Sequence, residues 1–374
     1  MPFDSMRRPQ SPHLETGRDS RIALERLFLV LILGISGWQC IQFVIRSAIE
    51  SPLIDFAYYY TYASATIRGV DLFNRKAVRA LAMQLGLRPT DSPAGYPPLF
   101  YFLIQPWAVL PYRASAVVWI LSHQLLLAAS VVICIRRFPS ASAIQVAGLM
   151  FLVINYHPLL EDIALGQSNI LVLFLATVAW WGLRTQHPWC TAASLAILLN
   201  TKPHFGLLVF VTWLLGYRAV CARMALPTGL TLVVTLLHFG LPHHLAFGQT
   251  ILSFSNQHLD WIQNMSVRSF LHKGFVKMGA SSACADLLWI ASAAGLLILL
   301  AIAHSNSQPS HPSRIDRGYG LGVTAAVLLS PFTENHHLVV LLLPLALLLL
   351  SDSPSHMSFA RRSALSVTLI LLAR

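Results

Sequence analysis

The sequence has 374 residues, of which 55% are hydrophobic and 11% are charged, and its mean hydropathy is +0.61. Soluble domains carry about 25% charged residues, so this composition excludes a soluble enzyme and a disordered chain. It predicts an all-α polytopic membrane protein, because the apolar runs are continuous rather than alternating as in a membrane β-barrel. The formal net charge is +11. A membrane protein is expected to be basic because its cytoplasmic loops accumulate Lys and Arg, so this charge does not indicate a nucleic-acid partner.

The apolar runs predict how the chain crosses the membrane. Residues 1–26 are expected to form a cytoplasmic N-terminal tail, and residues 27–374 a single transmembrane domain. A crossing needs about 20 apolar residues, and we expect about ten to twelve transmembrane helices in total. Leu27–Ile45 is predicted as a first helix rather than a removed signal peptide, because it lacks a small-residue cleavage pattern and many runs follow. The later runs are Ala114–Ile135, Ala141–Tyr156, Asn169–Leu183, Trp189–Thr201, Pro203–Tyr217, Ala225–Gly240, Leu287–His304, Gly318–Pro331, His336–Ser351 and a final run at Ser363–Arg374.

The arginines orient these crossings. If the N-terminus is cytoplasmic and each run crosses once, the short outside loops contain a single basic residue, Lys202. The bias agrees with the positive-inside rule and makes Lys202 a candidate for function. The short inside loops contain Arg136, Arg137, Arg184, Arg218, Arg223, Arg314, Arg317, Arg361 and Arg362.

The segment Tyr96–Tyr112 is apolar but short, and prolines interrupt it. A full crossing there would place every later arginine outside, so we expect a re-entrant or interfacial segment. Two long extracytoplasmic loops follow from this topology, at residues 46–95 and 241–286, and long loops often carry function. The inside loops lack a G-x-x-x-x-G-K motif, which disfavours an ATP-driven pump. The five cysteines form no C-x-x-C pair, so we expect neither a zinc site nor a disulfide framework.

The first candidate group lies just beyond the first crossing. Asp55 is flanked by apolar and aromatic residues, and a carboxylate near the hydrocarbon is costly without a partner or a function. It is either a general base or an acid paired with Arg46 or Arg68. Neighbouring tyrosines such as Tyr59 are typical of the membrane-interface belt, although some could stack on a sugar ring.

Two further groups lie between later crossings. Glu161, Asp162, Gln167 and Asn169 surround Gly166, and the two amides are either helix caps or ligands of sugar hydroxyls. Lys202 is either a snorkelling lysine at a helix end or a cation for a phosphate group.

The last two groups are in the second long loop and near the C-terminal runs. The loop residues that we favour as contacts are Ser255, Asn256, Gln257 and Arg268. The later group is Glu334, Asn335, His336 and His337. Adjacent histidines do not face one another on a helix and no H-x-x-x-H spacing accompanies them, so phosphate or hydroxyl contacts are favoured over a metal site.

Taken together, these motifs resemble glycosyltransferase family 87. The likeness is carried by IDFAYYY at 54–60, YPP at 96–98, GQSN at 166–169, TKP at 201–203 and SPFTENHHLVVLLLP at 330–344. The resemblance implies a GT-C-type fold with a long first extracytoplasmic loop, a catalytic Asp matching Asp55, and a polyprenyl-phosphate sugar, such as polyprenyl-phosphate mannose, as donor. It also implies a multi-pass protein of the bacterial inner membrane with its active face extracytoplasmic.

The chemistry expected of such an enzyme agrees with the residues. Attack by an acceptor hydroxyl needs one base, Asp55, whereas the leaving lipid phosphate needs cations rather than a second carboxylic acid. In-line attack would invert the anomeric carbon, and no cofactor beyond the lipid-linked donor is expected. The candidate phosphate ligands are Lys202, Arg268, His336 and His337. The candidate sugar or acceptor ligands are Tyr59, Tyr96, Asp162, Gln167, Asn169, Asn256, Gln257, Glu334 and Asn335.

The leading hypothesis is therefore a hexosyltransferase whose partners are the lipid-linked sugar, a glycolipid or glycan acceptor and membrane lipids. One alternative is a transporter or flippase for a lipid-linked glycan, which should place polar residues at mid-membrane and on both faces. A second alternative is an assembly subunit whose loops bind partners. The crowding of the candidates on one face favours the enzyme.

Overall fold

The computed structural model describes residues 13–89, 94–305 and 312–351, and every regular element in those ranges is a helix. This confirms the all-α prediction. The predicted run Ser363–Arg374 and the arginines Arg361 and Arg362 lie outside the described residues, as do the first twelve residues of the predicted N-terminal tail.

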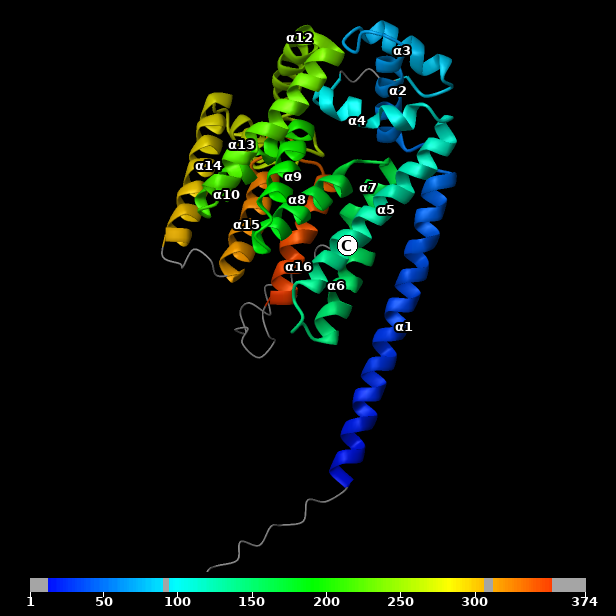
Figure 1. Ribbon diagram of the computed structural model, residues 1–374, viewed down its shortest axis with the longest axis vertical. Helices are drawn as coiled ribbons and strands as arrows, with labels where there is room; N and C mark the ends of the chain where they lie inside the picture. Colours follow the sequence, from blue (N-terminus) through cyan, green and yellow to red (C-terminus); the bar gives the residue numbers. More distant parts are fainter. Residues whose placement is uncertain (1–12, 90–93, 306–311, 352–374) are drawn as a thin grey trace, which may run out of the picture.

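The first half of the chain forms a long N-terminal helix, a group of shorter helices at one end of the molecule, and the helices of the central bundle (Figure 1). Helices α2, α3 and α4 make up the group at the end, at the top of Figure 1. These elements are α1 (His13–Ile49), α2 (Ile54–Ile67), α3 (Arg75–Gln84), α4 (Pro98–Ala108), α5 (Tyr112–Arg136), α6 (Ala143–Asn155), α7 (His157–Leu165), α8 (Asn169–Arg184) and α9 (Pro188–Thr201).

The second half of the chain completes the bundle with helices of very different lengths (Figure 1). Two of its elements, η1 and η2, are 3-10 turns that lead into α-helices. The elements are η1 (Pro203–Gly206), α10 (Leu207–Leu214), α11 (Arg218–Arg223), α12 (Ala225–Gln257), α13 (Val267–Lys277), α14 (Ser282–Ser305), α15 (Pro312–Leu328), η2 (Asn335–Leu341) and α16 (Leu342–Ser351).

Local sequence signals explain where several helices begin and end. Ser142 accepts a hydrogen bond from the Gln145 N–H and forms a capping box at the start of α6. Prolines occupy the first turns of α4, α7 and α9, where the missing N–H costs nothing. Helix α7 ends at Gly166, which adopts the left-handed conformation with φ 70°.

Each predicted crossing in the described residues corresponds to one or two helices, but few of these helices are long. By length and composition, three could span a membrane, Val30–Ile49, Tyr112–Arg136 and Arg218–Phe254, and the pair α6 and α7, bent by 43°, would make a fourth. Helices α8, α9 and α10 have 16, 14 and 8 residues, because turns with glycine or proline divide the apolar sequence. The expected total of ten to twelve crossings therefore stays a prediction.

The two predicted long loops are largely helical. Residues 46–95 contain α2 and α3, and the proline-interrupted segment that follows contains α4, whose 11 residues extend about 17 Å, less than a bilayer core. The second predicted loop begins differently from expectation, because α12 continues through a kink at Gly240 (φ 78°) to Gln257. The sequence signal at Gly240 and Pro242 marks a kink at which the backbone leaves the helical conformation, and a second helical stretch follows directly.

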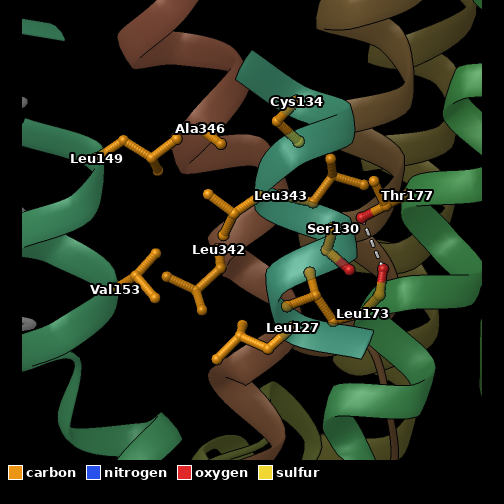
Figure 2. A pocket seen from close by; sticks show the side chains of 11 residues that line it. Leu127, Ser130, Cys134, Leu149, Val153, Leu173, Thr177, Leu342, Leu343 and Ala346 are labelled. Atoms are coloured by element: carbon orange, nitrogen blue, oxygen red, sulfur yellow. Dashed lines mark hydrogen bonds between the residues drawn. The ribbon is translucent and has the colours of Figure 1, made fainter. Parts of the chain in front are cut away.

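The core of the bundle forms where α8 packs against α5, α9 and α15. Trp180, Tyr319 and Tyr156 are among its largest fully buried side chains. A cavity of about 20 Å³ remains between α5, α6, α8 and α16 (Figure 2), close to the size of one water molecule. Its two hydroxyls, of Ser130 and Thr177, donate to carbonyls of their own helices, so the cavity is a packing defect and not a binding site.

Arginines from separate turns gather at one end of the bundle, which we call the arginine end. Arg137 lies over the Trp181 ring and Arg184 over the Phe138 ring. Arg184 also pairs with Asp316 at 3.1 Å. Helix α8 begins at Asn169 and ends at Arg184, so these two residues are about 22 Å apart along its axis. The residues near the start of α8 therefore lie at the opposite end from the arginines.

Candidate active site

Asp55 lies in the first turn of α2, where the helix dipole favours a carboxylate. The turn is set by Leu53, which is fully buried and has φ 42°. The Asp55 Oδ2 atom accepts a hydrogen bond of 2.9 Å from the Gln167 Nε2 atom, although 112 residues separate the two in the chain. The carboxylate is therefore held by an amide and has no arginine partner among its described hydrogen bonds.

Two tyrosines fix the orientation of the Gln167 amide. The Tyr59 hydroxyl donates to Gln167 Oε1 at 2.5 Å, and the Tyr96 hydroxyl donates to the same oxygen at 3.3 Å. The two hydroxyls are themselves 2.7 Å apart. Because both phenols engage the amide oxygen, the amide nitrogen must face the Asp55 carboxylate, which makes Gln167 a support for Asp55.

A close approach of two backbones brings Gln167 to Asp55. A Cβ atom on Gly166 would lie 2.7 Å from the Phe56 Cβ and 3.1 Å from the Leu53 Cβ. The Gly166 carbonyl also accepts a hydrogen bond of 2.9 Å from the Trp119 indole N–H. Glycine is thus required at position 166 for two reasons: the positive φ, and the close contact between α2 and the turn that precedes α8.

A second network surrounds Lys202. The Lys202 ammonium donates a short hydrogen bond to Asn169 Oδ1, and the Asn169 amide nitrogen donates to Asp162 Oδ1 at 2.7 Å. Lys202 is 5% exposed and Asp162 is 1% exposed. The ammonium also lies 5.8 Å from the centroid of the Tyr96 ring. Asn169 therefore bridges a buried cation and a buried carboxylate. The contact of Lys202 with the Tyr96 ring connects this network to the tyrosines that hold Gln167.

A third network joins α7 to η2. Asn335 donates a short hydrogen bond to the Glu161 carboxylate, and its amide nitrogen is 3.0 Å from His157 Nδ1. His336, 3% exposed, lies between Glu334 at 3.4 Å and Glu161 at 3.9 Å. This arrangement holds the His336 ring between two carboxylates.

The three networks form one electrostatic unit, which we call the polar cluster. It consists of Asp55, Glu161, Asp162, Gln167, Asn169, Lys202, Glu334, Asn335 and His336. Burial raises the pKa of Asp55 above its usual value, against His336, the Gln167 hydrogen bond and Lys202, which lower it. Burial likewise raises the pKa of Glu334, and it lowers the pKa of Lys202 against the attraction of Asp162 and Asp55. A half-buried carboxylate with a raised pKa is a stronger proton acceptor than an exposed one, which suits a general base.

A sequence comparison identifies the kind of protein that carries this cluster. The model of glycosyltransferase family 87 matches residues 95–331, which include Tyr96, Asp162, Gln167, Asn169 and Lys202. The chain belongs to glycosyltransferase family 87. No curated protein and no solved structure matched it.

The family 87 model stops short of two parts of the polar cluster. Asp55 precedes the matched residues, and Glu334, Asn335 and His336 follow them. Their place in the site rests on the structure, which connects Asp55 to Gln167 and His336 to Glu161.

Other residues predicted for the site of this family 87 chain lie elsewhere. Arg268 pairs with Asp286 at 2.8 Å, donates to Asn256 at 3.0 Å and lies over the Trp289 ring. These contacts place Arg268 and Asn256 among α12, α13 and α14. Gln257 is exposed at the end of α12, and the side chain of Ser255 lies outside the described part. Their predicted roles stay predictions, and the contacts described here for Arg268 and Asn256 are with residues outside the polar cluster.

His337 is next to the polar cluster but has a structural partner of its own. Its Nδ1 atom accepts a hydrogen bond of 3.0 Å from the Glu334 N–H and completes a capping box at the start of η2. Ligand atoms of Glu334, His336 and His337 lie within 4.8 Å of one another. In a neutral His337 ring that accepts at Nδ1, the other nitrogen carries the proton, so His337 could bind a metal only if this cap were broken.

The structure adds two residues to those selected as site residues from the sequence. Glu161 was noted beside Asp162 but not selected, although it contacts both Asn335 and His336. Its signal was a second acid in an apolar stretch. Trp119, which holds the Gly166 carbonyl, gave no signal, because it is one aromatic residue among the apolar residues of α5.

Proposed function

We propose that this family 87 glycosyltransferase transfers a sugar from a polyprenyl-phosphate donor to an acceptor hydroxyl at the extracytoplasmic face of a bacterial inner membrane. Mannose is the sugar that the family likeness favours. The observation that carries the proposal is the Asp55 carboxylate, which Gln167 orients and which interacts electrostatically with Lys202 and His336.

Asp55 fits the role of general base. Its raised pKa brings proton uptake closer to neutral pH, where a general base is most effective. Gln167 supports the ionised form by hydrogen bonding to it. The proton of the acceptor hydroxyl would pass to Asp55 as the acceptor oxygen attacks the anomeric carbon. Attack from the side opposite the lipid phosphate would invert that carbon.

Lys202 fits the role of a phosphate ligand. An ammonium has three N–H donors, and the described structure engages one of them, with Asn169. The others are available to oxygens of the leaving lipid phosphate. His336 supplies a second cationic group when protonated. The nearby carboxylates Glu161 and Asp162 counterbalance these charges when the donor is absent.

The proposed orientation has support from the distribution of charge. The polar cluster and the arginine end are at opposite ends of α8. Arginines concentrate on the cytoplasmic side of membrane proteins, which supports an extracytoplasmic position for the polar cluster. A lipid-linked sugar has its reactive carbon beside the head group, so a site at a bundle end suits it better than a site at mid-membrane, as a flippase would need.

The decisive experiment replaces the proposed base. Asp55→Asn keeps the shape of the side chain but cannot accept the proton. We expect transfer from radiolabelled polyprenyl-phosphate mannose to fall by about 10²–10⁴-fold. The matched control is Asp71→Asn, because Asp71 belongs to the same predicted loop, is 61% exposed and accepts a hydrogen bond from the Phe73 N–H.

Wild-type turnover by a normally expressed Asp55→Asn variant would remove Asp55 as the base. Absence of transfer by the wild-type protein from every polyprenyl-phosphate sugar tested, together with sugar-lipid translocation in proteoliposomes, would replace the enzyme by the carrier hypothesis.

A further inference from the structure

A cavity at the arginine end is separate from the polar cluster. Its volume is about 240 Å³, and it lies between the turn joining α8 to α9 and the turn joining α10 to α11. Gly182 and Gln186 line one side, and Gly216, Tyr217 and Arg223 line the other. Positive φ angles at Gln186 (60°) and Gly216 (93°) shape the two turns. The cavity is therefore built by two tight turns that face one another.

The polar groups of this cavity are mainly donors. The Gln186 amide nitrogen donates to the Tyr217 oxygen at 3.2 Å, which leaves the Tyr217 O–H to donate elsewhere. The Arg223 guanidinium donates once to the Ala219 carbonyl at 3.2 Å. Its remaining N–H groups are available, since a guanidinium has several donors in a plane. A ligand of this cavity would need acceptor oxygens and negative charge.

The charge around the cavity favours an anion as well. Arg137, Arg184, Arg218 and Arg223 lie at this end, each over an aromatic ring. Among the described residues of α5 to α15, Asp316 is the carboxylate that lies with them, and it is already engaged by Arg184 and by the Trp180 indole. The arginine end thus carries a positive charge that the described protein does not balance.

The surroundings point to a lipid as the source of the anion. Arg223 lies 5.9 Å from the ring centroid of Trp189, which is 54% exposed, and Arg218 lies 5.3 Å from that of Trp213, which is 45% exposed. Exposed tryptophans with arginines are typical of the depth where lipid head groups lie. Basic pockets between membrane helices bind anionic head groups, and here Arg223 and Tyr217 would meet the phosphate.

We infer that the cavity between the α8–α9 and α10–α11 turns binds the phosphate head group of an anionic phospholipid. Arg223 supplies the charge and the Tyr217 hydroxyl a second donor, while the acyl chains lie along the exposed apolar surface beside Trp189. The site is independent of the proposed sugar transfer, because it uses none of the residues of the polar cluster.

The test compares lipids on the full-length protein. Purified protein in detergent is titrated with phosphatidylglycerol, phosphatidylcholine or inorganic phosphate, and bound ligand is counted by native mass spectrometry. We expect phosphatidylglycerol to bind, and Arg223→Ala to weaken that binding about tenfold, as expected for loss of a charge-assisted hydrogen bond. Arg218→Ala is the matched control, because Arg218 is on the same short helix and lies over Trp213 but does not line the cavity.

Each other outcome decides against the proposal. Equal binding of phosphatidylcholine would mean that binding does not depend on the net charge of the head group. Binding of inorganic phosphate but of no lipid would mean that the cavity is an anion site and not a lipid site. Equal losses in Arg223→Ala and Arg218→Ala would mean a diffuse basic surface. Tyr217→Phe removes one hydroxyl and tests the site even if Arg223→Ala fails to fold. The proposal requires Tyr217→Phe to weaken phosphatidylglycerol binding while its unfolding temperature is unchanged.

Discussion

Replacing Gln167 by alanine would test how the site prepares Asp55. The change removes the amide that donates to Asp55 Oδ2 at 2.9 Å. A hydrogen bond to a charged group contributes about 1.5–3 kcal/mol, and one pKa unit corresponds to about 1.4 kcal/mol. Because the lost bond favoured the ionised carboxylate, its removal should raise the pKa of Asp55 by about one to two units.

The assay is the pH dependence of kcat/KM for transfer from the polyprenyl-phosphate sugar. Its acid limb reports the base of the free enzyme, so the limb should move to higher pH by about one to two units in Gln167→Ala. Activity well above that limb should fall less. The matched control is Gln105→Ala, since the Gln105 amide donates to Thr66 and lies 2.7 Å from His238 Nε2, with no described contact to Asp55.

Two results would refute the reasoning. An acid limb that coincides with that of the wild type, in a variant that folds normally, would show that Gln167 does not support the Asp55 carboxylate. The same displacement in Gln105→Ala would show that the limb reports a general change of helices α2 and α4.

Two further predictions concern the neighbours of this pair. Since burial lowers the pKa of Lys202, the ammonium should lose its charge as pH rises through a range below that of ordinary lysines, and kcat/KM should show an alkaline limb there. Lys202→Ala should lower donor use and abolish that limb. An alkaline limb that persists in this variant would belong to another group. Gly166→Ala should destabilise the protein by about 2–5 kcal/mol in thermal unfolding, from a strained positive φ and from overpacking against Phe56. Gly69→Ala shares the positive φ but has open space around it, so equal losses in the two variants would rule out the overpacking.

The composition and the apolar runs determined the class of the fold. Continuous apolar stretches can satisfy their backbone groups in a membrane only as helices, and each run in the described residues is helical. The arginines also predicted that separate turns share one end of the bundle. In the structure Arg137 and Arg184 lie over rings beside the end of α8, and Arg223 lines a cavity with residues of that same end. Helix lengths were less predictable. Hydropathy is averaged over many residues, so it does not show where a short turn, such as that at Gly216, divides an apolar run.

The sequence by itself proposed the residue types of the site, and only the tertiary structure decided their partners. Gln167 looked like a sugar ligand but faces Asp55, and Lys202 looked isolated but is bridged by Asn169 to Asp162. Arg268 matched the chemistry equally well, yet its partner is Asp286. Hydropathy and charge are properties of neighbouring residues, whereas these pairings join positions as far apart as 112 residues. Such pairings depend on the packing of α2, α7, α8 and η2 against one another, which no local pattern encodes.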